Sequence, residues 1–372
     1  MLTKYDEFLC HQIATTFDHV DTSAREWTER VIVHFGHTEG KCHLSLGFGL
    51  YPNRNVIDAF ALLNVDNKTQ YTVRASRELR PQPDEVKVGP FSYEIVQPLK
   101  KVRCRLDDNQ YGLSYDIEFD GIMLPSEEDP QFTRYKGRVI ENIQRYIQAG
   151  RGSGWIKFEG NTINVDKKTC FVGRDHSWGV RRTGAWQETG VEPPPIPPGY
   201  LYSWGILQFD KWGAAFHTRE LWDGTQLLSS GAIFYPYGSE KKEIRMARIA
   251  HDFKFRPDMR KLTAGSVTLI APDGAKTEIS LKSLSYTCLK PGGYFDYRGF
   301  VHGQWMGPSF IDGFKLDLTD PNVLRDVSFI DDAGCELRCG KELGYGCIEV
   351  TVTGKYPKYG YEGYEGNLPG HS

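Results

Sequence analysis

Hydrophobic and polar positions alternate with a period of two over much of the chain. The clearest run covers residues 42–50, where Cys, Leu, Leu, Phe and Leu are separated by polar or small residues, and a second run covers 31–35. Such alternation predicts β-strands with one buried and one solvated face. The segment between them, GHTEGK at 36–41, contains two glycines and predicts a hairpin loop.

The same alternation predicts further strands. A long run covers 111–119, and shorter runs cover 102–106, 279–281, 284–288 and 348–352. One apolar and one polar face are typical of antiparallel sheets, because parallel strands are mostly apolar on both faces. The apolar positions of segment 139–147 fit either a helix or a strand, so this segment stays ambiguous on pattern alone.

Many short strands with frequent glycine predict an all-β chain built as two antiparallel β-barrels in tandem. A single closed sheet of 372 residues would be unusually large. The proline-rich stretch 192–199 fits neither a helix nor a ladder and is interpreted as a connector. We therefore expect a first barrel over 1–190, a second over 191–356, and a flexible Gly/Tyr-rich tail over 357–372.

Composition narrows the class of function. Aromatic residues make up 13% of the chain, which suits a sheet-rich protein and an apolar pocket. A formal net charge of −3, without a long Lys/Arg run, argues against nucleic-acid binding. The chain has no apolar stretch of about 18 residues, so no membrane-spanning helix is predicted. The acidic N-terminal segment does not fit a secretory signal. We expect a cytoplasmic protein whose partner is a small hydrophobic molecule; the oligomeric state is not predicted.

Cysteine and histidine spacing predicts no metal site. Three of the eight cysteines cluster as C-x3-C-x7-C at 335, 339 and 347, without a second C-x-x-C or a nearby histidine. His34, His37 and His43 lie on facing strands of one predicted hairpin, but His34 and His43 fall in its polar phase, where solvated residues are expected. We therefore predict reduced thiols, no metal and no cofactor.

The densest cluster of reactive groups is GRDHSWGVRR at 173–182. It combines a carboxyl, an imidazole, a hydroxyl, an indole and three guanidinium groups within ten residues. Its two glycines predict a turn or a strand end. Upstream, RYIQAGRGSG at 145–154 precedes a predicted hairpin turn at 159–161, and two aromatic-rich strands are expected downstream at 200–209 and 212–222.

The segments RY-x-Q-x-G-R-x-x-G and G-x-RDHSWG-x-R resemble the AttH and carotenoid hydratase-like proteins. The resemblance is most specific over 145–181, extends loosely to 27–52 and 202–234, and ends by about residue 250. It implies two lipocalin-like (calycin) barrels around an apolar ligand space, and it favours a strand at 138–149. That family includes hydratases of isoprenoid double bonds, pericyclic cyclases and proteins without a known activity, so the fold transfers better than the activity.

Hydration of an alkene needs a proton donor and stabilisation of the resulting cation. The resemblance points to Asp175, His176 and Trp178. We assign Asp175 as the acid, a carboxyl kept neutral by burial, and His176 as the base or as the partner that orients Asp175. Trp178, together with Tyr202 and Trp204 from the following strand, would bind the substrate through aromatic faces.

A structural role fits the same motif. Neighbouring side chains on a strand point to opposite faces, so Asp175 and His176 share a pocket only if a bulge intervenes. Asp175 would otherwise pair with an arginine of the motif (Arg174, Arg181 or Arg182), and Trp178 would close one end of the barrel.

A second aromatic and polar cluster lies at 294–305. If the second barrel contributes to the ligand space, Tyr297, His302 and Trp305 are its candidates for substrate binding, although aromatic strand residues more often form core. His217 and Glu220 have no distinguishing sequence context.

These patterns support three functional hypotheses. The first is a cofactor-independent hydro-lyase that adds or removes water at a C=C bond of an isoprenoid, steroid-like or polyketide-like substrate by acid–base catalysis. The alternatives are a non-catalytic protein that binds a small hydrophobic ligand, and a pericyclase or isomerase that acts by folding its substrate. The absence of G-x-S-x-G, dinucleotide-binding and P-loop patterns argues against other common enzyme classes.

Overall fold

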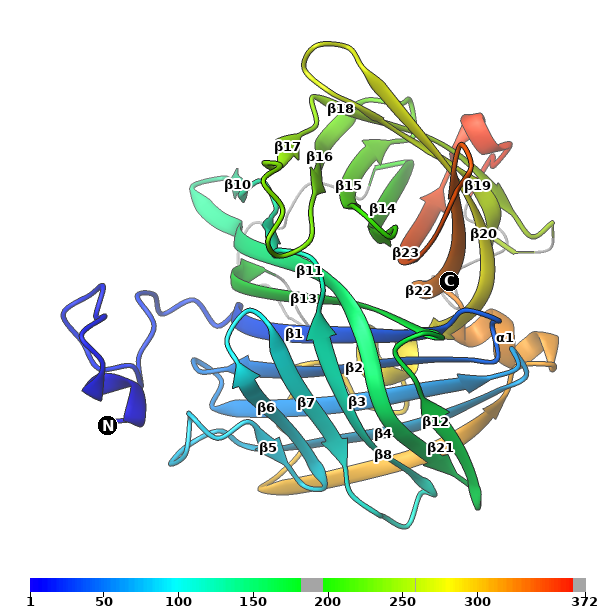
Figure 1. The fold of residues 1–372 in the computed structure, drawn as a ribbon. Helices are drawn as coiled ribbons and strands as arrows, with labels where there is room; N and C mark the ends of the chain where they lie inside the picture. Colours follow the sequence, from blue (N-terminus) through cyan, green and yellow to red (C-terminus); the bar gives the residue numbers. More distant parts are fainter. Residues whose placement is uncertain (182–196, 258, 364–372) are drawn as a thin grey trace.

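The computed structural model describes residues 1–181, 197–257 and 259–363. Over these residues the chain forms two curled antiparallel sheets, one above the other in Figure 1. This arrangement is that of tandem lipocalin-like barrels and confirms the predicted fold class. No helix in the described part of the chain is long and apolar enough to cross a bilayer.

The first sheet has 14 strands in the described residues, in the order β21-β4-β3-β2-β1-β13-β11-β8-β7-β6-β5, with β9, β10 and β12 also paired to β11. Its strands are β1 (Trp27–His37), β2 (Cys42–Tyr51), β3 (Val56–Val65), β4 (Thr69–Glu78), β5 (Lys87–Val88), β6 (Phe91–Gln97), β7 (Lys101–Leu106), β8 (Leu113–Gly121), β9 (Ser126–Glu127), β10 (Gln131–Tyr135), β11 (Arg138–Phe158), β12 (Asn161–Val165), β13 (Cys170–Arg181) and β21 (Ser309–Asp317).

The second sheet has nine strands in the described residues, in the order β17-β16-β15-β14-β23-β22-β20-β19-β18. They are β14 (Gly199–Gln208), β15 (Gly213–Leu221), β16 (Gln226–Phe234), β17 (Ile244–Arg245), β18 (Arg248–Phe255), β19 (Leu262–Ile270), β20 (Lys276–Cys288), β22 (Asp331–Cys339) and β23 (Glu342–Gly354). One α-helix, α1 (Pro321–Val327), and three short 3-10 helices, η1 (Lys4–Glu7), η2 (Lys290–Gly292) and η3 (Pro357–Tyr359), complete the described elements.

Each sheet curls around its own apolar core. In the first, the apolar phase of β1, β2 and β8 points inward, with residues such as Phe35, Leu46 and Phe119 almost fully buried. In the second, Phe216, Val267 and Ile348 belong to the corresponding core. The alternation in the sequence therefore identified much of the first core and, in the second, residues of β20 and β23 such as Ile279 and Ile348, but not those of β18 and β19.

Several local predictions are confirmed. Residues 138–149 lie within the long strand β11 and not in a helix, and the hairpin turn at 159–161 separates β11 from β12. The two aromatic-rich strands downstream are β14 and β15. The prediction that 173–182 forms a turn or strand end is wrong for its described residues, because 173–181 continue β13 in register with β1 and β11.

The second half of the chain contributes one strand to the first sheet. Figure 1 shows β21, in orange, along the lower edge of that sheet, where it pairs with β4 over its whole length. Of the proline-rich stretch, residues 192–196 lie outside the described residues. Of the expected tail, residues 357–359 form η3 and the Tyr359 hydroxyl lies 2.6 Å from Nδ1 of His251, while 364–372 lie outside the described residues.

Arg74 on β4 fixes the connection that leads to β21. Its side chain is fully buried, pairs with Asp312 at 2.8 Å, and donates to the carbonyl oxygens of Pro291 and Tyr297 at 3.2 and 2.7 Å. Its guanidinium carbon also lies 4.8 Å from the centroid of the Phe300 ring. One side chain thus holds three separate parts of the 290–317 segment against the first sheet.

We predict that Arg74→Ala lowers the free energy of unfolding by about 3–5 kcal/mol, because it leaves buried acceptors without their cation. Urea denaturation measures this change. The control is Arg338→Ala, whose pair with Glu336 is solvent-exposed and should contribute less than about 0.5 kcal/mol. Equal, small losses for both variants would contradict the role given to Arg74.

Candidate functional site

The outward face of the first sheet is polar and yet buried, because the second half of the chain packs against it. We call this interface the polar seam. Its members on the first sheet include Arg30, His34, His43, Ser45, Asp58, Gln70, Arg74, Arg145 and Asp175, each 8% exposed or less. The prediction that His34 and His43 are solvated is therefore wrong: their strand face is polar, but it meets protein, and both residues are 0% exposed.

Asp175 lies in the middle of the polar seam. It is 8% exposed, and its backbone pairs with Ile32 on β1 and Ile147 on β11. Gly173, on the same face of β13, sits so close to β14 that an added Cβ would lie 3.2 Å from Ile206. In the described part of the chain, the Asp175 carboxylate forms no hydrogen bond and no ion pair within 4.0 Å. The alternative pairing with Arg174 or Arg181 is therefore not formed, and Arg182 lies outside the described residues.

His176 and Trp178 occupy the opposite face of β13. His176 Nε2 lies 2.8 Å from a Glu29 carboxylate oxygen, and its Nδ1 lies 3.3 Å from the Tyr146 hydroxyl. The Trp178 ring packs at 5.3 Å from the His176 ring and is 37% exposed. Since β13 keeps its regular register, strand alternation separates these two residues from Asp175, and the proposed Asp175–His176 pair is not brought together.

Tyr202 and Trp204 approach the polar seam from β14. Trp204 is 1% exposed, and its indole Nε1 donates to Glu128 at 2.5 Å. The Tyr202 ring packs edge-on against His217 at 5.1 Å, and burial raises the pKa of the Tyr202 hydroxyl well above its usual value. Both side chains therefore lie on the same interface as Asp175.

The residues of the 294–305 cluster lie in different environments. His302 is 2% exposed and lies within the polar seam, with Nε2 3.2 Å from Arg30 and 2.8 Å from the Gly292 carbonyl oxygen. Tyr297 packs against Phe314 on β21, and Trp305 is 52% exposed. Of the three candidates, the structure places His302 in the seam; Tyr294, which the sequence reasoning did not select, stacks edge-on against it at 4.8 Å.

A buried ionic network, also missed from the sequence, fixes one end of the seam. Glu128 accepts from Arg145 at 3.3 Å and lies 3.2 Å from Nδ1 of His217. Burial alone would raise the pKa of Glu128, but the charge of Arg145 and the hydrogen bonds from His217 and Trp204 lower it to about 2. Glu128 lies on the β9–β10 connection and its three partners lie on β11, β14 and β15, so no local motif could have revealed the network.

The charge of Asp175 acts to raise the pKa of three first-sheet arginines, Arg30, Arg145 and Arg181, against the effect of burial, without forming an ion pair with any of them. Burial alone would lower the pKa of Arg145, yet Glu128 and Asp175 raise it above its usual value. Burial, with the charges of Arg30 and Arg145, lowers the pKa of Arg181 to about 10. Tyr294 stands beside them: its hydroxyl is buried without a hydrogen-bond partner in the described residues, and Arg30 lies 5.1 Å from its ring. The centre of the seam thus holds a carboxylate, cations and phenol groups.

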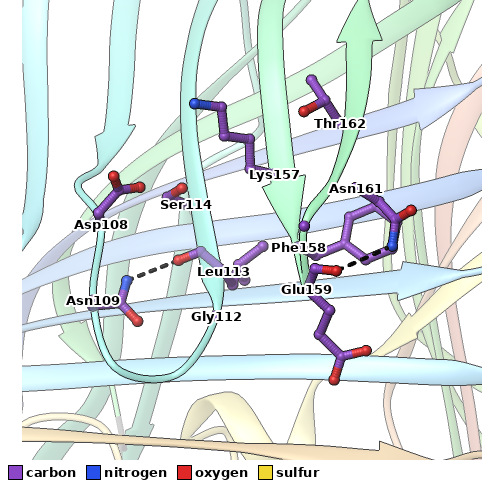
Figure 2. Close-up of a pocket in the computed structure, with 11 residues that line it drawn as sticks. Asp108, Asn109, Gly112, Leu113, Ser114, Lys157, Phe158, Glu159, Asn161 and Thr162 are labelled. Atoms are coloured by element: carbon purple, nitrogen blue, oxygen red, sulfur yellow. Dashed lines mark hydrogen bonds between the residues drawn. The ribbon is translucent and has the colours of Figure 1, made fainter.

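Two surface hollows lie away from the centre of the seam. The first, of about 440 Å³, lies at the hairpin ends near Asn109 and Asn161. The amides of these two residues donate to the carbonyls of Leu113 and Glu159 (Figure 2). The polar groups of this hollow serve the turns themselves. A second hollow, of about 560 Å³, lies between the halves and is lined by apolar residues including Leu99, Leu124 and Phe234. Phe234 belongs to the same cluster as Ile147, the strand neighbour of Asp175, so this hollow adjoins the seam.

The profile of a family of unknown function, DUF8625, matches residues 2–362. The chain belongs to the DUF8625 family. No curated protein sequence matches this DUF8625 chain.

Solved structures show the fold that this DUF8625 chain shares. A crystal structure from Nitrosomonas europaea, provisionally named AttH, has a TM-score of 0.52 at 12% identity and covers 87% of this chain and 92% of its own. The complex of CghA with Sch210972 has a TM-score of 0.50 at 9% identity, covering 88% of both chains. Kievitone hydratase from Nectria haematococca has a TM-score of 0.42 at 10% identity, covering 92% of this chain and 94% of its own. The resemblance to AttH-like proteins is confirmed as a shared fold.

We predict that Glu128→Gln lowers the free energy of unfolding at neutral pH by about 3–5 kcal/mol, because the buried Arg145 loses its counter-charge. The folded-state pKa of Glu128 is depressed to about 2. Its stabilisation is therefore complete above the unfolded value of about 4.3 and is lost as pH falls toward 2.

Urea denaturation between pH 2 and 7 measures both effects. The gap between the unaltered chain and Glu128→Gln should narrow as pH falls through this window. Glu118→Gln, at a surface pair with Lys101, is the matched control and should leave the pH profile unchanged. A constant gap at every pH would show that Glu128 is not held ionised by its partners.

Proposed function

We propose that this chain is an enzyme that adds water to, or removes it from, a carbon–carbon double bond of a lipophilic substrate, such as an isoprenoid, steroid-like or polyketide-like molecule. The observation that carries the proposal is Asp175, a carboxylate that is more than nine-tenths buried and has no hydrogen-bond or ion-pair partner in the described residues. Unsatisfied buried charged groups are costly, and where they persist they are candidates for function.

The apolar part of the substrate would bind in the hollow between the halves, which is separated from Asp175 by a buried apolar cluster. The hollow between the halves is lined by Leu99, Leu124 and Phe234, of which the first two are 49% and 39% exposed. From there the apolar cluster of Met123 and Ile147 leads to Asp175. Burial of apolar surface contributes about 25 cal/mol per Å², which favours a lipophilic partner and agrees with the sequence resemblance over 145–181.

The charges around Asp175 favour one form of the reaction. A free carbocation beside Arg30, Arg145 and Arg181 would be repelled, whereas an oxyanion would be stabilised. This supports a double bond conjugated to a carbonyl, where water addition or loss passes through an enolate. It replaces the cation-stabilising role first assigned to the aromatic rings of Tyr202 and Trp204.

The arginines around Asp175 also change the role that we propose for its carboxyl group. In this reaction Asp175 accepts a proton instead of donating one, so the role of acid first assigned to it changes to that of base. In dehydration of a β-hydroxy carbonyl compound, Asp175 would take the α-proton, the arginines would hold the enolate oxygen, and a neutral tyrosine would protonate the departing hydroxyl group. Tyr294 and Tyr202 qualify, because burial raises the pKa of each hydroxyl well above its usual value. Hydration follows the same steps in reverse.

The test uses the full chain with a panel of conjugated enones and β-hydroxy ketones carrying prenyl, steroid-like or polyketide-like apolar groups. Incubation in water labelled with heavy oxygen, followed by mass spectrometry, should show the label in a hydrated product. A product of unchanged mass would instead indicate the isomerase or pericyclase alternative. Ligand retained in native mass spectra without any turnover would indicate a binding protein.

We predict that Asp175→Asn reduces turnover by about 10²–10⁴-fold, the usual contribution of a general acid or base. Its melting temperature should stay close to that of the unaltered chain, because the carboxylate supports no hydrogen bond or ion pair. Asp120→Asn, at a surface pair with Lys167, is the control and should keep full activity. If Asp175→Asn instead unfolds early and retains activity in proportion to its folded fraction, the catalytic assignment fails.

A further inference from the structure

A second group of unsatisfied side chains lies at another point of the polar seam. His34 on β1, His43 on β2, Asp332 on β22 and Cys347 on β23 each offer one ligand atom, and these atoms all lie within 4.8 Å of one another. All four residues are buried, at 0% exposure. Two come from the first sheet and two from the second, so this cluster bridges the halves of the molecule.

Several nitrogen and oxygen atoms of the cluster have no partner in the described structure. Both ring nitrogens of His43, Nε2 of His34 and Oδ1 of Asp332 are buried without a hydrogen bond. Native proteins pair nearly all such atoms, because burial without a partner costs free energy. Unsatisfied atoms on three neighbouring residues point to a ligand here, which would take one atom from each residue.

The neighbouring groups orient these side chains. His34 Nδ1 lies 2.6 Å from Asp332 Oδ2, which also accepts from the Ser45 hydroxyl at 2.6 Å. These contacts hold the Asp332 carboxylate beside the His34 ring, so two of the four ligand groups are already next to each other. Gly334 leaves room for His43, since a Cβ at that position would lie 2.7 Å from His43 Nδ1.

We propose that these four side chains form a zinc site that fastens the two sheets together. Imidazole nitrogens, a thiolate and a carboxylate are the ligands that Zn²⁺ prefers, whereas Mg²⁺ and Ca²⁺ take oxygen ligands alone. Zinc bonds of about 2.0–2.3 Å place tetrahedral ligands roughly 3.5 Å apart, so the cluster needs to contract by only about an ångström. Four protein ligands leave no open position, which assigns the ion a structural role, separate from the reaction proposed for Asp175.

The first experiment uses the untagged full chain. Elemental analysis by mass spectrometry should find one zinc per chain, and removal with a chelator should lower the melting temperature, which added Zn²⁺ restores. Replacement by Co²⁺ should give the visible absorption of a tetrahedral site together with a thiolate-to-cobalt charge-transfer band. Little zinc in the purified chain, with no response of melting or absorption to added metal, would overturn the proposal.

Variants separate metal binding from packing. Cys347→Ser should weaken zinc binding by at least about 100-fold and abolish the charge-transfer band, and His43→Asn should likewise weaken binding. Cys335→Ala is the matched control: this thiol is equally buried on the same β22–β23 hairpin but lies in the core of the second sheet. It should melt earlier yet still bind one zinc. Equal zinc binding by Cys347→Ser and Cys335→Ala would contradict the site.

Discussion

The burial of one polar sheet face against the other half of the chain is the constraint on which this structure depends. The first sheet presents Arg30, His34, Asp58, Arg145 and Asp175 on the face that a barrel normally turns to water. Desolvating such groups is costly unless each finds a partner. Several contacts of this kind cross the interface: Arg30 with His302, Ser45 with Asp332, and Gln70 with the backbone of Cys288. The relative position of the two sheets is therefore set by directional polar contacts, and apolar packing is added around them.

Against this background, the groups that lack a partner stand out. Along the seam, Glu128 pairs with Arg145 and His217. In the described residues, by contrast, both ring nitrogens of His43 are buried without a hydrogen bond, and the Asp175 carboxylate forms no hydrogen bond or ion pair. A network of paired groups is accounted for by the stability that it gives the fold. A buried group without a partner instead costs free energy, and binding of a substrate or an ion would offset that cost. This difference is why the functional hypotheses rest on Asp175 and on the His43 cluster.

Local pattern predicted much of the fold and little of the site. Alternation located β1, β2, β8 and much of the first core, because a period of two follows directly from strand geometry. It could not show what covers the polar face, so His34 and His43 were expected in water. It also could not pair His43 with Cys347, which are brought together only by the packing of two separate sheets. The motif at 173–181 contains Asp175, which lies in the seam, but the regular register of β13 turns His176 and Trp178 to the opposite face.

The same interface also links the two proposals physically. Asp175 and the arginines lie on the first sheet, while Tyr202 comes from β14 and Tyr294 from the segment after β20, so the proposed donor and acceptor of protons belong to different halves of the chain. Electrostatic stabilisation of an enolate depends on charges that are already in place, since moving them during the reaction would consume the gain. A site assembled from two sheets meets this condition only if the sheets cannot shift. The Glu128 network holds one part of the seam, and a metal ion between β1, β2, β22 and β23 would hold another. The buried polar contacts would then contribute to the proposed reaction by holding the two sheets in fixed positions, although they take no part in the chemical steps.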